Sequence, residues 1–78
     1  MRNPERLDNF YDTMKSLHKA CFPDLRWGQL MMNFLGWVQQ EQKRDPFFPE
    51  EPVMLNYFKE YCETYNPIGY HKWEDIKI

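Results

Sequence analysis

Three stretches of the sequence carry apolar side chains at intervals of three and four residues, and a proline or a turn sequence ends each one. Because an α-helix turns through about 100° per residue, this spacing places the apolar side chains of a stretch on one helical face. The pattern predicts helices over about 4–21, 25–41 and 51–64. In the first stretch the face consists of Leu7, Phe10, Tyr11, Met14, Leu17, His18 and Cys21.

Proline and polar residues mark the expected ends of these helices. Asn3 and Pro4 suit the N-cap and the first position of the first helix. Pro23 disfavours the helical conformation of the residue before it, so the first helix should end there. We expect Asp24 to cap the second helix and the turn-forming residues 66–69 to end the third.

The length of 78 residues allows one domain with a small core, since a chain of this size buries only about 60% of its unfolded surface. Aromatic residues make up 18% of the chain, and such large side chains let a few residues build that core. We expect an all-α, compact three-helix bundle over residues 1–66. Residues 67–78 should form an extended tail, because Trp73, Ile76 and Ile78 follow neither helical nor strand spacing.

Charge and hydropathy argue against two classes of partner. The net charge is −2 and the longest basic run is Lys43-Arg44, so nucleic acid is an unlikely ligand. The longest apolar stretch, residues 30–38, is too short to span a bilayer. The N-terminus lacks the pattern of a secretory signal. We therefore expect a cytoplasmic protein without membrane contact, whose two cysteines stay reduced.

A short motif connects the first two helices. The run P-D-L-R-W-G-Q-L at residues 23–30, with D-P-F-F at 45–48 and the acidic start of the third helix, resembles a group of small bacterial and phage-associated helical proteins. Their sequences follow P-D-x-R-x-G-Q-L and then D-x-F-[FY]. The resemblance covers about residues 4–64 and leaves out the tail. It implies an all-helical protein of bacterial or phage origin and assigns no activity.

A polar stripe on the second helix is the first candidate site. Arg26, Gln29 and Asn33 lie opposite the apolar face of that helix. The structural interpretation is that they hold the backbone of the linker at 45–49, with Arg26 paired to Asp45, because most side-chain hydrogen bonds go to backbone or water. The functional alternative is a small-anion or partner site at Arg26.

Histidine and cysteine could in principle ligate zinc here. His18 and Cys21 lie one turn apart, with Cys62 on the third helix and His71 in the tail, but this spacing differs from that of structural zinc sites. We expect no metal and no cofactor: the cysteines should be small buried side chains, and His18 should sit at the core edge with one ring nitrogen bonded. No phosphate loop, hydrolase or metalloprotease motif occurs, so we predict no catalytic residue and no enzyme.

Several large apolar side chains exceed what a three-helix core of this size should cover, and exposed patches of such residues mark contact surfaces. We predict a non-enzymatic protein that acts through protein–protein contacts, with a homodimer as the simplest form. One alternative is that linker and tail fold back over these side chains, and another is a DNA-binding helix-turn-helix. The candidate interface residues are Met32, Trp37, Phe47, Phe48 and Trp73.

Overall fold

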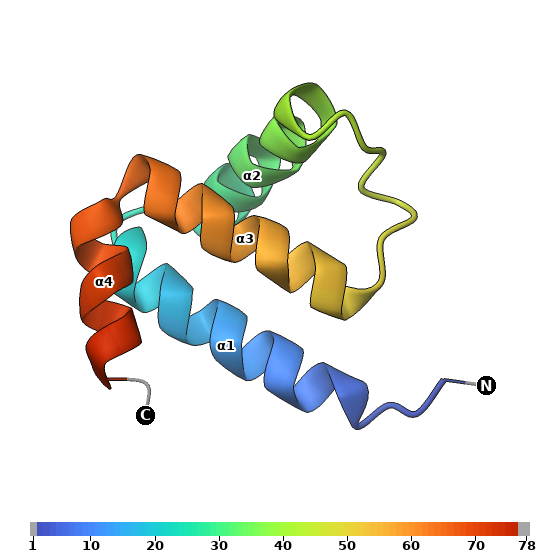
Figure 1. Ribbon diagram of the computed structural model, residues 1–78, viewed down its shortest axis with the longest axis horizontal. Helices are drawn as coiled ribbons and strands as arrows, with labels where there is room; N and C mark the ends of the chain where they lie inside the picture. The colour runs from blue at the N-terminus through green and yellow to red at the C-terminus, as the bar shows by residue number, and fades with distance from the viewer. Residues whose placement is uncertain (1, 77–78) are drawn as a thin grey trace.

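The computed structural model describes residues 2–76, which form four helices and no strand. Figure 1 shows α1 and α3 side by side and running in the same direction, with α4 across the end where both finish and α2 behind α3. The predicted all-helical class and the first three helices are confirmed. The helices are α1 (Arg6–Cys21), α2 (Trp27–Glu41), α3 (Glu51–Tyr65) and α4 (Pro67–Ile76).

The predicted extended tail is wrong, because residues 67–76 form α4 and complete a four-helix fold. Pro67 occupies the first position of this helix, where its missing N–H leaves no hydrogen bond unmade. Trp73 turns inward from α4 and is only 6% exposed, so the tail carries part of the core. Lys77 and Ile78, which belonged to the predicted tail, lie outside the described residues.

Asn66 fixes α4 to the end of α1. Its side-chain amide donates to the carbonyl of Cys21 at 2.8 Å, which satisfies one of the free carbonyls at the end of a helix. Its side-chain oxygen accepts the N–H of Gly69 at 3.1 Å, as an N-cap does in the first turn of a helix. One side chain therefore caps both helices and sets the angle between them.

Ion pairs hold the other ends of α1 and α3 together. Arg6 Nε donates to Glu51 Oε1 at 3.0 Å, and Arg2 forms a two-pronged pair with Glu50 just before α3. Both pairs are accessible to solvent, where screening and side-chain entropy leave such contacts little net stabilisation. Their main effect is to align the start of α1 with the start of α3, and they add little to the stability of the fold.

Tyr61 on α3 is the centre of the aromatic part of the core. Its ring contacts those of Phe34 and Trp37 on α2, with centroids 5.6 and 5.4 Å away, and that of Phe22 after α1 at 5.6 Å. These contacts join α2 to the rest of the molecule, and α3 is the helix whose backbone comes nearest to that of α2. The buried core consists of Leu17, Cys21, Leu30, Phe34, Val38, Phe58, Tyr61, Cys62 and Trp73.

The start of α2 differs from the prediction in two respects. The N-cap is Arg26 and not Asp24, and the side chain of Gln29 accepts the backbone N–H of Arg26 at 2.9 Å. Helical spacing places Trp27 on the same face as Leu30 and Phe34, which predicts that it is buried, but Trp27 is 70% exposed. It stands in the first turn of α2, beside Tyr11 at a shallow groove against α1, and so lies beyond the end of the core.

Candidate functional site

The predicted polar residues do not form one site. Arg26 precedes α2 and Asp45 follows it, so a helix of 15 residues, about 22 Å long, separates the two side chains. Gln29 is engaged in capping, and Asp45 accepts the N–H of Phe47 within its own loop at 3.0 Å. Asn33, one turn along α2 from Gln29, lines a groove between α2 and α3.

Side chains of α3, and not those of the polar stripe, hold the beginning of the linker. Gln42 donates to the carboxylate of Glu60 at 2.7 Å, and Arg44 reaches the hydroxyl of Tyr57 at 3.4 Å. The backbone N–H of Arg44 also bonds to the carbonyl of Val38. These contacts fix the path of the chain up to residue 44 and leave the following aromatic pair outside the fold.

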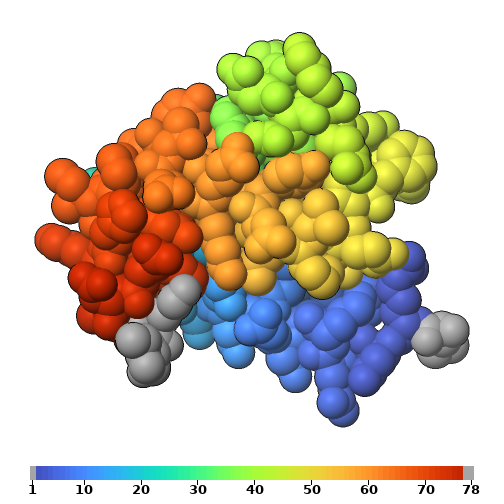
Figure 2. Space-filling view, in the orientation of Figure 1, coloured from blue at the N-terminus to red at the C-terminus, as the bar shows by residue number. Residues whose placement is uncertain are grey.

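The linker exposes two adjacent aromatic rings. Phe47 is 83% and Phe48 70% exposed, and their rings stack edge to face against each other with centroids 5.0 Å apart. Figure 2 shows this segment, in yellow, projecting at the right-hand edge of the molecule. The linker therefore does not fold back over the core, whereas the predicted tail does.

The free side of α2 carries further exposed apolar side chains. Met32 is 79% exposed and Leu35 36%, and with Trp27 they lie within about 140° of one another around the helix. No charged residue occurs anywhere between Trp27 and Gln40, although 28% of the chain is charged. We call Trp27, Met32, Leu35, Phe47 and Phe48 together the α2–linker surface.

Two of the five predicted interface residues are not part of the α2–linker surface. Trp73 is buried under α4, and Trp37 is half-buried against Tyr61. Sequence reasoning missed Trp27 and Leu35, since helical periodicity places Trp27 with the core. The absence of charge along α2 was the available signal that its outer side differs from an ordinary solvated face.

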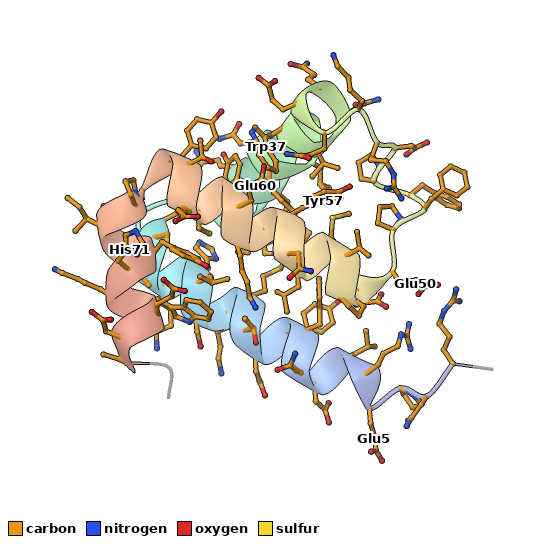
Figure 3. The ribbon with its side chains drawn as sticks, in the orientation of Figure 1. Glu5, Trp37, Glu50, Tyr57, Glu60 and His71 are labelled. Carbon is orange, nitrogen blue, oxygen red and sulfur yellow. The ribbon has the colours of Figure 1, made fainter. Side chains whose placement is uncertain are left out.

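A groove of about 400 Å³ lies between α2 and α3. Trp37 stands where α2 crosses α3, as Figure 3 shows. The backbone at Gly36 borders open space, because a Cβ built there would meet no atom within 4 Å. The groove is lined by Met32, Asn33, Gly36, Trp37, Gln40, Glu41, Tyr61 and Tyr65.

A larger hollow of about 520 Å³ lies between α1 and α4. It contains two hydroxyl groups, those of Thr13 and Ser16, which would be the obvious nucleophiles. Both are occupied within α1: Thr13 bonds to the side chain of Asn9 at 3.4 Å, and Ser16 donates to the carbonyl of Asp12 at 3.0 Å. Neither hydroxyl is hydrogen-bonded to the side chain of Asp12 or Lys19, the charged residues that share the hollow.

Both cysteines are buried, as the sequence predicts, and no disulfide joins them. The thiols of Cys21 and Cys62 lie close to each other between α1 and α3. Burial raises the pKa of the Cys62 thiol far above its usual range, and it raises the pKa of Cys21 as well. Reactive cysteines require the opposite shift, so this pair acts as a part of the core.

Both histidines have polar partners in the structure. His18 lies at the edge of the core with Nε2 2.9 Å from the carbonyl of Leu25, which confirms the prediction and holds the α1–α2 turn. His71 is exposed on α4 beside the carboxylates of Glu63 and Glu74, at 3.8 and 3.4 Å. Within residues 2–76, no three His, Cys, Asp or Glu side chains are grouped as a metal site would need.

Comparisons with protein-family models, with curated proteins and with solved structures found no match to this chain. Within residues 2–76, no helix combines the length and the apolar character needed to cross a membrane.

Proposed function

We propose that this protein is non-enzymatic and acts through protein–protein contacts made by the α2–linker surface. The observation that carries the proposal is the exposure of Phe47 and Phe48 at 83% and 70%. Burying one such side chain contributes roughly 1.5–3 kcal/mol, which matters in a domain with so small a core. A partner that covers the two rings would recover this contribution, and aromatic residues of this kind are frequent in the centres of interfaces.

A second copy of the chain is the simplest partner. The α2 part of the surface bears no charge, so two copies can meet along it without placing like charges opposite one another. A two-fold dimer would bury the same residues on both subunits. The main alternative, binding to DNA by α2, has weaker support, because residues 27–40 offer no Lys or Arg to phosphate. A small-anion site would rest on Arg26 alone.

Sedimentation equilibrium at micromolar concentration tests this proposal. We expect a particle of twice the 9.7 kDa of one chain, which dissociates when Phe47 and Phe48 are both replaced by serine. Ile68→Ser is the matched control, since Ile68 is 71% exposed but lies on α4. A monomer at every concentration would remove the dimer. A dimer that dissociates equally in the control would show that the α2–linker surface is not the interface.

A further inference from the structure

The groove between α2 and α3 presents three aromatic rings. Tyr61 is buried and touches Trp37, with centroids 5.4 Å apart and planes at 66°. It also touches Tyr65, at 4.8 Å and 48°. Tyr65 is 56% exposed and Trp37 is half-buried, so rings inclined to one another reach from the core to solvent. Gly36 lacks the side chain that would stand in the open space beside them.

The electrostatics of this groove favour a positive ligand. Glu41 is the single charged residue in its lining, and no Lys, Arg or His contributes to it. The amides of Asn33 and Gln40 complete its polar part. The groove is formed by the C-terminal half of α2 and the last turn of α3, and neither helix has a basic residue in its last turn. The partial negative charge at these helix ends is therefore not neutralised by a basic side chain of the same turn.

We propose that this groove binds an organic ammonium group, of the quaternary or methylated kind. The faces of aromatic rings attract such cations, which are weakly hydrated and make apolar contact through their methyl groups. Glu41 supplies the counter-charge, and a volume of about 400 Å³ is sufficient for a small ligand. A free quaternary ammonium compound and the trimethylated lysine of a peptide share this chemistry. The site shares Met32 with the α2–linker surface but uses neither Phe47 nor Phe48, so different variants test the two proposals.

Titration of the full chain with choline, followed by calorimetry and by the indole N–H resonances, tests the proposal. The matched probe is 3,3-dimethylbutan-1-ol, which has nearly the same shape and no charge. We expect choline to bind about tenfold more tightly than this alcohol and to shift the indole resonance of Trp37. A trimethyllysine peptide and its unmodified counterpart form the second arm. Tighter binding of the trimethylated peptide than of choline would identify a peptide as the source, and the reverse would identify a free cation.

Two variants and one control assign the binding to the groove. Tyr65→Ala removes the exposed ring and Glu41→Gln the counter-charge, and each should weaken choline binding at least severalfold. Tyr11→Ala should leave it unchanged, because Tyr11 is similarly exposed, at 61%, but lies on α1. Equal affinity for choline and the alcohol would overturn the proposal. So would unchanged choline binding in both Tyr65→Ala and Glu41→Gln.

Discussion

Gly69 provides a sharp test of how α4 packs. In an ordinary helix interior, Gly→Ala is stabilising by up to about 1 kcal/mol, because alanine restricts the unfolded chain. A Cβ at Gly69, however, would stand 2.6 Å from the carbonyl oxygen of Ala20 and 2.9 Å from Nδ2 of Asn66. The first of these is backbone, which cannot turn aside, and the second belongs to the side chain that caps α1. Gly69→Ala must therefore push α4 away from α1.

Three contributions determine how much Gly69→Ala should change the free energy of unfolding. Overpacking costs typically 1–3 kcal/mol, and a weakened hydrogen bond from Asn66 to Cys21 adds about 1 kcal/mol. The gain in helix propensity offsets up to about 1 kcal/mol of this cost. The free energy of unfolding should fall by roughly 1–3 kcal/mol, and Tm by about 4–8 °C for each kcal/mol in a domain of this size.

Urea denaturation followed by circular dichroism measures this change, and Gly28→Ala is the matched control. A Cβ at Gly28 would meet no atom within 4 Å, so the same substitution should raise the free energy of unfolding by up to about 1 kcal/mol. The two glycines should thus respond with opposite signs. If Gly69→Ala were stabilising like Gly28→Ala, the described packing of α4 against α1 would be refuted.

Two further changes test the core and the junction between helices. Asn66→Ala should lower the free energy of unfolding by about 1–3 kcal/mol, because the Cys21 carbonyl and the Gly69 N–H lose their partner; hydrogen exchange should then speed up most in α4. The raised pKa of Cys62 means that the folded state retains the thiol proton more strongly than the unfolded state does. The contribution of Cys62 to stability should be constant below the ordinary thiol pKa of about 8.5 and fall as the pH rises above it. Cys62→Ala should be less stable at neutral pH but show a shallower alkaline decline in urea titrations at pH 7 and 10.

Periodicity was sufficient for α1, α2 and α3 because their apolar stripes extend over several turns. It was not sufficient for α4, a helix of ten residues that depends on contacts with another part of the chain. Pro67 gave a local signal for its start, but the capping by Asn66 is visible only when the end of α1 is beside it. Short helices are held by tertiary packing more than by their own propensity.

Sequence periodicity also does not show which residues from different parts of the chain meet, and this explains the errors in the predicted sites. Helical angle alone placed Trp27 in the core, and it gave no measure of how far Asp45 lies from Arg26, since angle gives no position along the axis. The exposed pair Phe47 and Phe48 was predictable, because the prolines around it exclude a helix. The aromatic groove could not be predicted: Trp37 and Tyr61 come from different helices, and the sequence does not show that they meet.

The bond from Asn66 to Cys21 joins residues 45 positions apart, and this has a consequence for synthesis on the ribosome. At roughly 5–20 residues per second, several seconds pass between the emergence of α1 and that of its cap. Until α3 begins to emerge, the inward side chains of α1, Leu17 among them, have neither α3 nor α4 to cover them. The nascent chain therefore completes its fold late, and its N-terminal third is the part most dependent on protection from premature association.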